Sequence, residues 1–271
     1  MSEKDQQTKE NGKPKNDSKS NDQRVIEVML AGRKTVTVDS ETLIKETQKR
    51  IWASLKTGIE YQDMFENSDN FLREHAFDRL QIFVLFVDLV GSTDLTLSLP
   101  AKKVASIMSS FSQEMAFVLK HHRGYVLKFV GDAVIGYFIP GNSPLLIADY
   151  VVNSAIRMRE VVEKGINPIL NEYDYPELNI KIGIDYGESV VVQYGKSKVK
   201  SHVDLLGPAL SIAAKIQNLA KPNQILIGED VFTKLHPSLK KLFTEKHWHG
   251  NEWRYHDRET GKLYPVFEIV D

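Results

Sequence analysis

A nearly continuous apolar segment runs from Gln81 to Leu89 and contains one acidic residue, Asp88, beside its carboxyl end. An apolar segment of this length without polar alternation is typical of a strand that is buried on both faces. A carboxylate at the end of such a strand is costly unless it is paired or binds a cation. The segment therefore predicts a central strand of a sheet that delivers an acid to a site.

The residues after this strand alternate between helical and extended patterns. Residues 100–122 carry apolar side chains at helical spacing, and residues 142–165 begin a second helix with Pro144 in its first turn. Gly207 and Pro208 begin a third helix, which ends near Ala220. The predicted extended segments are a hairpin over 125–138, a strand pair over 179–185 and 189–194, and strands over 224–227 and 263–270. This order predicts an α+β fold with helices against one sheet.

The chain divides into three parts by composition. Residues 1–24 are almost free of apolar side chains, which predicts a disordered tail. Residues 25–79 form an extension, with a small hairpin over 25–38 and a capped helix from Asp39 to about Gly58. This extension is either a dimerisation or regulatory element, or a scaffold that packs on the main domain. Residues 80–271 form the main domain.

Charge and composition exclude several classes of function. The chain has 35 Lys and Arg against 36 Asp and Glu, a net charge of -1, so it carries no overall basic field for nucleic acid or a membrane surface. It contains no cysteine, which excludes disulfides, thiolate zinc sites and cysteine nucleophiles. There is no apolar run of about 18 residues and no apolar core of a signal peptide. We expect a cytoplasmic protein without nucleic-acid or membrane partners.

The first candidate site follows the central strand. Asp88 ends it, Gly91 permits close approach of the backbone to a ligand, and Ser92 or Thr93 can cap a helix whose first amides suit a polyphosphate. An aspartate that only caps a helix is the alternative.

The second candidate site is the predicted hairpin. Asp132 follows Gly131 at its tip, a position that Asp also takes for purely conformational reasons. Lys128 lies inside an otherwise apolar strand, where an unpaired ammonium is disfavoured. If Asp88 and Asp132 are neighbours in space, they form a carboxylate pair suited to two Mg²⁺ ions on a triphosphate.

The third candidate site begins the last long helix. Asp204 precedes Gly207, and Ser211 and Lys215 are four residues apart and share one helix face. A helix with one exposed lysine is the alternative when this segment is taken alone.

Together these three segments resemble the catalytic domain of class III adenylate and guanylate cyclases, over about Leu80 to Val270. The resemblance implies a ferredoxin-like sheet with helices on one face. It makes Asp88 and Asp132 the ligands of two Mg²⁺ or Mn²⁺ ions, and Lys128 and Asp204 the pair that recognises a purine base. Segment 183–187 resembles the family's strand-turn glycine motif, and Lys262 matches a phosphate-binding lysine near the C-terminus.

The resemblance also implies a reaction and an assembly. ATP would be closed to cyclic AMP at active sites that two chains of a homodimer share. Ser211 and Lys215 stand where the family usually has Asn and Arg, which orient the ribose and stabilise the transferring phosphate; Lys keeps the charge but loses the planar fork. Two alternatives remain: a degenerate cyclase that binds nucleotide and dimerises, and a cyclase of GTP or a pyrimidine nucleotide. The Lys128 and Asp204 pair is taken as evidence against a pyrimidine.

Overall fold

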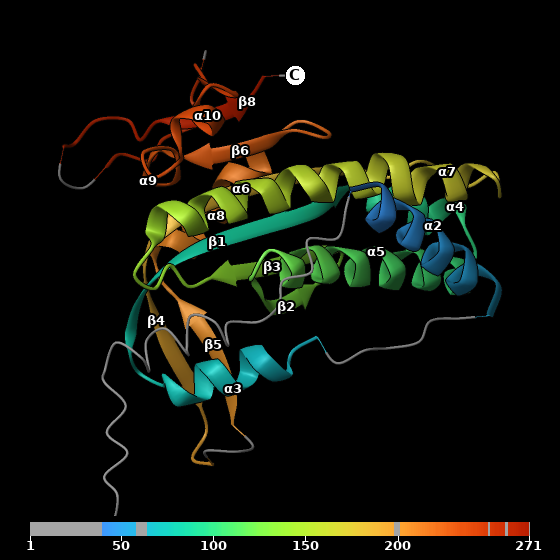
Figure 1. Ribbon diagram of the computed structural model, residues 1–271, viewed down its shortest axis with the longest axis horizontal. Coiled ribbons are helices and arrows are strands. Elements are labelled where there is room, and N and C mark those ends of the chain that lie inside the picture. The colour runs from blue at the N-terminus through green and yellow to red at the C-terminus, as the bar shows by residue number, and fades with distance from the viewer. Residues whose placement is uncertain (1–39, 58–63, 198–200, 249, 258–259, 271) are drawn as a thin grey trace, which may run out of the picture. The chain divides into compact units, whose positions relative to one another are not determined.

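The computed structural model describes residues 40–57, 64–197, 201–248, 250–257 and 260–270 (Figure 1). All of them belong to the second of two units into which the chain divides, 1–37 and 38–271. The predicted tail over 1–24 and the predicted hairpin over 25–38 lie outside the described residues. Within the described residues, no helix is both long and apolar enough to cross a membrane.

The centre of the described fold is a mixed sheet built around β1 (Arg79–Val90), which is the predicted central strand. Its strands are ordered β2-β3-β1-β4-β6-β8-β7, with β5 paired to β4. β1 runs antiparallel to both β3 (Ala133–Phe138) and β4 (Asn179–Tyr194), and β2 (Tyr125–Val130) completes the predicted hairpin with β3. The predicted α+β class is thereby confirmed.

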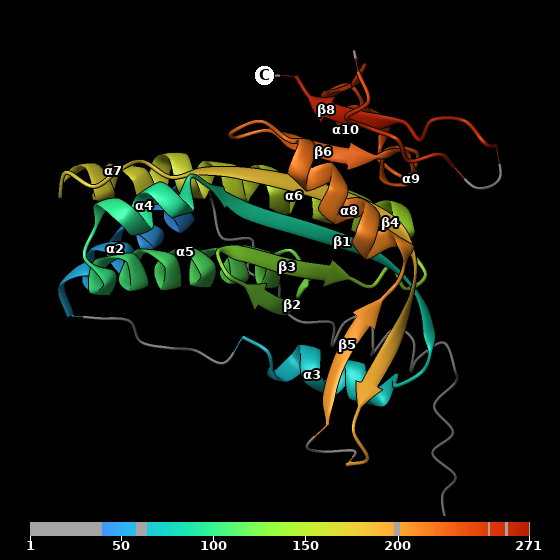
Figure 2. The same cartoon turned by 180° about the vertical axis from the view of Figure 1, so that it is seen from behind.

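Helices cover β1 on both faces, as Figures 1 and 2 show together, whereas the resemblance implied helices on one face. Phe83, Leu85 and Val87 face a core made with α5 (Ala101–His121) and α6 (Pro144–Glu160), which are two of the predicted helices. The alternate residues Ile82 and Val84 pack in a second core with α8 (Pro208–Leu219), α3 (Glu66–Glu74) and β5 (His202–Leu206). Because successive side chains of β1 enter two different cores, the segment over 81–89 is apolar at nearly every position.

Residues 179–194 form one continuous strand, whereas the sequence predicted two strands separated by a turn. The strand continues through Gly187, the glycine between the two predicted strands, and it is Gly183, inside the first of them, that brings α8 close to the sheet. A Cβ at Gly183 would lie 2.3 Å from the backbone nitrogen of Gln217, and one at Gly187 would lie 3.6 Å from Cβ of Ala209. The partner of the second half of β4 is β5, a strand that the sequence did not predict.

The second long helix also extends past its predicted end at Gly165. It continues from α6 through the π-helical turn η1 (Val161–Ile166) into α7 (Asn167–Asn171). A Cβ at Gly165 would lie 2.8 Å from Cγ2 of Thr47, so this glycine admits α2 rather than ending the helix.

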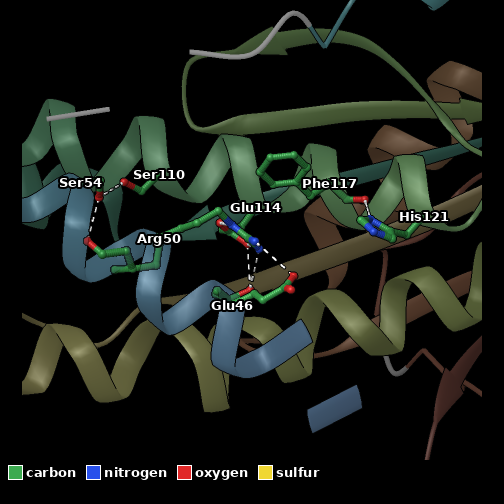
Figure 3. Close-up of polar contacts among 9 residues, drawn as sticks. Glu46, Arg50, Ser54, Ser110, Glu114, Phe117 and His121 are labelled. Atoms are coloured by element: carbon green, nitrogen blue, oxygen red, sulfur yellow. Dashed lines mark hydrogen bonds and ion pairs between the residues drawn. The ribbon is translucent and has the colours of Figure 1, made fainter. Parts of the chain in front are cut away.

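The predicted helix of the extension is α2 (Ser40–Thr57), and it is attached to α5 by buried polar contacts (Figure 3). The Arg50 guanidinium donates to both carboxylate oxygens of Glu114 at 2.6 and 2.7 Å, and Thr47 donates to the same carboxylate at 2.8 Å. Ser54 and Ser110 share a hydrogen bond of 2.7 Å. Glu114 is buried, so its carboxylate oxygens need the hydrogen bonds that these partners from α2 supply.

The C-terminal part adds three strands to the sheet. β6 (Ile225–Gly228) runs parallel to β4, and β8 (Val266–Ile269) lies between β6 and β7 (Phe243–Glu245). Short helices α9 (Glu229–Phe232) and α10 (Pro237–Lys240) connect β6 to β7. The predicted strands over 224–227 and 263–270 correspond to β6 and β8.

Candidate active site

Asp88 and Asp132 are brought together where β1 ends beside the β2–β3 hairpin. Gly131 has a φ of 62° and makes the tight turn that places Asp132, a conformation that glycine adopts at little cost. Burial of Asp88 and the neighbouring charge of Asp132 raise the pKa of the Asp88 carboxyl above its usual value. Two carboxylates held together in partial burial are a hard oxygen ligand set, which is the donor chemistry that Mg²⁺ and Mn²⁺ prefer.

Gln217 forms a hydrogen bond with one carboxylate oxygen of Asp88. Its buried side chain on α8 donates from Nε2 to Oδ2 of Asp88 at 3.1 Å. The sequence analysis missed this residue, although a glutamine on the apolar stripe of a helix was the available signal. The contact fixes the orientation of Asp88 relative to α8.

The loop after β1 differs in detail from the prediction. The residue that caps α4 (Ser92–Ser98) is Gly91, with φ of 73°, and no side chain caps the helix. Ser92 and Thr93 lie in its first turn, so neither is the predicted cap. Gly91 and Ser92 line a cavity of about 290 Å³ with the end of β1 and residues 176–178.

Lys128 and Asp204 form a direct ion pair between β2 and β5. Nζ of Lys128 donates to Oδ2 of Asp204 at 2.5 Å, and Oδ1 of Asp204 accepts from the backbone of Leu205 at 2.9 Å. The two side chains are 35% and 14% exposed, so the pair is partly shielded but open to a ligand. Asp204 lies 76 residues after Lys128 in the sequence. It supplies the partner that a lysine inside an apolar strand requires.

Ser211 and Lys215 lie on one exposed face of α8, as their spacing predicts. Lys215 is two residues from Gln217, and two residues turn a helix by about 200°. Because Gln217 points at Asp88, Lys215 points to the other side of α8, into a cavity of about 390 Å³. Its lining is Lys215, Asn218 and Leu219 of α8 with residues 252–256.

Lys262 is not brought to this cavity. It is exposed, and its described contacts are made by its backbone, which accepts from the backbone nitrogen of Asp257 and donates to the Thr260 hydroxyl. Arg254, which the sequence analysis did not select, lines the cavity instead.

Within the described residues, no three His, Cys, Asp or Glu side chains cluster to hold a metal ion.

Asp185 in β4 is a buried acid that the sequence analysis did not select. It is fully buried, and its Oδ1 accepts from the Tyr264 hydroxyl at 2.8 Å. Burial raises the pKa of Asp185 to about 8, so the carboxyl is mostly protonated at neutral pH. Its Oδ2 has no hydrogen-bond partner among the described residues.

Residues 75–252 match the sequence model of the family described as adenylate and guanylate cyclase catalytic domain. Among curated proteins, the chain is similar to a cytidylate cyclase of Escherichia coli, at 30% identity over 54% of this chain and 34% of that protein. It is also similar to a cytidylate cyclase of Staphylococcus aureus, at 28% identity over 60% of this chain and 39% of that protein. The chain thus spans between a third and two fifths of these relatives.

Two solved structures have a similar fold. The guanylyl cyclase Cya2 matches 72% of this chain and 93% of its own, with a TM-score of 0.58 and 22% identity. The adenylyl cyclase CyaB from P. aeruginosa matches 72% of this chain and 95% of its own, with a TM-score of 0.59 and 20% identity.

Proposed function

The chain belongs to the adenylate and guanylate cyclase catalytic domain family, and we propose that it converts a nucleoside triphosphate into its 3′,5′-cyclic monophosphate and pyrophosphate. The observation that carries this proposal is the joint presence of an adjacent Asp88–Asp132 pair and a preformed Lys128–Asp204 pair. The first suits the metal ions of a triphosphate, and the second suits the edge of a base.

The reaction is an intramolecular phosphoryl transfer. The 3′-oxygen of the ribose forms a bond to the α-phosphorus and its hydroxyl proton is released. The bond from the α-phosphorus to the oxygen bridging to the β-phosphate breaks, and pyrophosphate leaves with that electron pair. The protein positions the two ends of one substrate and stabilises the charge that develops between them.

Asp88 and Asp132 would hold two Mg²⁺ or Mn²⁺ ions. The raised pKa of Asp88 fits this role, because two neighbouring carboxylates need a cation to remain ionised together. When bound, such ions neutralise phosphate charge and favour ionisation of the 3′-hydroxyl. Gln217 would keep Asp88 oriented whether or not the ions are present.

The Lys128–Asp204 pair selects the base by polarity. Lysine donates to a ring nitrogen and aspartate accepts from an exocyclic amino group, a pattern that adenine presents on its Watson–Crick edge. Guanine and uracil present a ring N–H beside a carbonyl, which is the reverse. ATP is therefore our first candidate substrate and GTP is disfavoured.

CTP is the second candidate. Cytosine also presents an acceptor nitrogen beside an amino group, so the pair does not exclude this pyrimidine, contrary to the interpretation given to it in the sequence analysis. The relatives named cytidylate cyclase make this a specific alternative.

Two chains would contribute to each active site. Within one chain, Gln217 and Asp88 lie on one side of α8 and Lys215 points to the other. A single chain therefore does not place Lys215 against the metal pair, whereas a head-to-tail homodimer can. Phe129 and Val130 are exposed beside the Asp132 turn and offer apolar surface for a second copy.

The experiment is incubation of the purified chain with ATP, CTP, GTP or UTP and Mn²⁺ or Mg²⁺, with products identified by mass. We expect cyclic AMP or cyclic CMP to dominate. The Lys128→Glu/Asp204→Cys double variant exchanges the donor at 128 for an acceptor and removes the Asp204 carboxylate, so that two carboxylates do not face each other. In this variant the preference for ATP or CTP over GTP should shrink. An unchanged preference would place base recognition elsewhere. No product with any nucleotide would favour the nucleotide-binding alternative that the Ser211 and Lys215 departures suggest.

A further inference from the structure

The cavity beside Lys215 carries a second cation that no motif points to. Arg254 lines it from the segment over 252–256, opposite Lys215, Asn218 and Leu219 of α8. Glu252 is the one acidic residue in the lining, so the two fixed cations outnumber it. A cavity with this charge favours an anion over a neutral or cationic ligand.

The frame around Arg254 is rigid. The neighbouring Trp253 is buried and donates from Nε1 to the backbone oxygen of Tyr264 at 2.7 Å. Trp253 also belongs to a core cluster with Ile212 and Ile216 of α8, the same helix that carries Lys215. Both walls of the cavity are thus parts of one packed unit, which holds the backbone positions that carry the two cations.

The guanidinium of Arg254 is itself oriented. Its Nε donates to the backbone oxygen of Asn251 at 3.0 Å. No ion pair of Arg254 or Lys215 occurs among the described residues, so the terminal nitrogens of Arg254 remain available to a ligand. Two terminal nitrogens on a planar group can bind two oxygens of one phosphate, which a lysine cannot do.

We propose that Arg254 binds the phosphates of the substrate together with Lys215 and supplies the planar fork that Lys215 lacks. The inference rests on the proposed function, because it assigns Arg254 to the triphosphate of that reaction. The leaving pyrophosphate gains negative charge as the bond to the α-phosphorus breaks, and a guanidinium held beside it stabilises that charge. Arg254, and not Lys262, is then the phosphate-binding cation of the C-terminal part of the chain.

A binding measurement tests this without turnover. Inorganic pyrophosphate is titrated into the full chain with Mg²⁺ in a calorimeter. We expect Arg254→Ala to weaken binding by roughly 10- to 100-fold, the range for a lost hydrogen bond to a charged group. Arg79→Ala, which removes an exposed arginine at the start of β1, is the matched control and should leave the affinity unchanged. Equal affinity of the wild type and Arg254→Ala would overturn the inference.

Kinetics give a second, independent readout. Arg254→Ala should lower kcat on the order of 10²-fold, and Lys215→Arg in that background should recover part of the loss by restoring a fork. A loss that Lys215→Arg leaves unrepaired, or a loss in Lys262→Ala larger than in Arg254→Ala, would contradict the assignment. If the wild type forms no cyclic nucleotide, the proposed function fails, while pyrophosphate binding still decides the role of Arg254.

Discussion

The carboxylate of Asp88 lies in surroundings that disfavour its charge, because it is partly buried and faces Asp132. A folded-state pKa above the usual 3.8 means that the contribution of Asp88 to stability is present at low pH and is lost as pH rises through the raised pKa. In Asp88→Asn at pH 7 without metal, we expect the free energy of unfolding to rise by on the order of 1 kcal/mol. Turnover should fall below about a tenth of the wild-type rate, since the substitution removes a proposed metal ligand. Denaturant unfolding and product assay, made on the same sample, check both; an active Asp88→Asn enzyme would contradict the metal assignment.

Asp185 gives a prediction about pH that is separate from catalysis. Its pKa is about 8 in the folded state and 3.8 by its usual value, so the folded protein keeps a proton that the unfolded chain loses. Stability should therefore decline steadily as pH rises from about 4 to 8 and level off above that. In Asp185→Asn the decline should be smaller, because the side chain no longer titrates. Urea midpoints from about pH 5 to 9 measure this, and parallel pH profiles of the two proteins would refute the buried protonated acid.

Among the elements, the contact between α8 and β4 decides how the site is assembled. A Cβ at Gly183 would lie 2.3 Å from the backbone nitrogen of Gln217, and backbone atoms cannot rotate away. Gly183→Ala should therefore shift α8, cost about 1–3 kcal/mol of stability and lower turnover by moving Gln217 away from Asp88. Gly187→Ala is the matched control in the same strand, because its new Cβ meets Ala209 at an ordinary 3.6 Å. Equal stability and activity of the two variants would show that this close contact does not set the site.

The elements that sequence could predict are those with local signals. β1, the hairpin around Gly131 and helices α5 and α8 follow from apolar spacing and turn residues within each segment. Gly187 and Gly165 were interpreted as breaks, whereas β4 continues through Gly187 and Gly165 admits Thr47 from a distant part of the chain. Gly183, inside a predicted strand, admits Gln217 in the same way. The same limit applies to the site: the order of the motifs indicated Asp88, Asp132, Lys128 and Asp204, but Gln217 and Arg254 depend on packing that no segment encodes alone.

On the scale of the whole molecule, α8 separates two half-sites. Asp88 with Gln217 lies on one side, and Lys215 with Arg254 lines a cavity on the other. Under the proposed function, a working active site would take Asp88 and Asp132 (the metal half) from one chain. It would take Lys128, Asp204, Lys215 and Arg254 (the cationic half) from its partner. The proposed arrangement accounts for an acid pair that Lys215 of the same chain does not face, and under it we expect activity to require the dimer.

The most direct test of this account mixes two inactive chains. Asp88→Ala lacks the metal half, and Lys128→Ala/Lys215→Ala lacks the cationic half, so only a mixed dimer contains one intact site. After subunit exchange, verified with distinguishable tags, we predict cyclic nucleotide formation at about a quarter of the wild-type rate, because half of the dimers are mixed and each has one working site of two. No activity above that of the separate variants, once exchange is demonstrated, would contradict the shared active site.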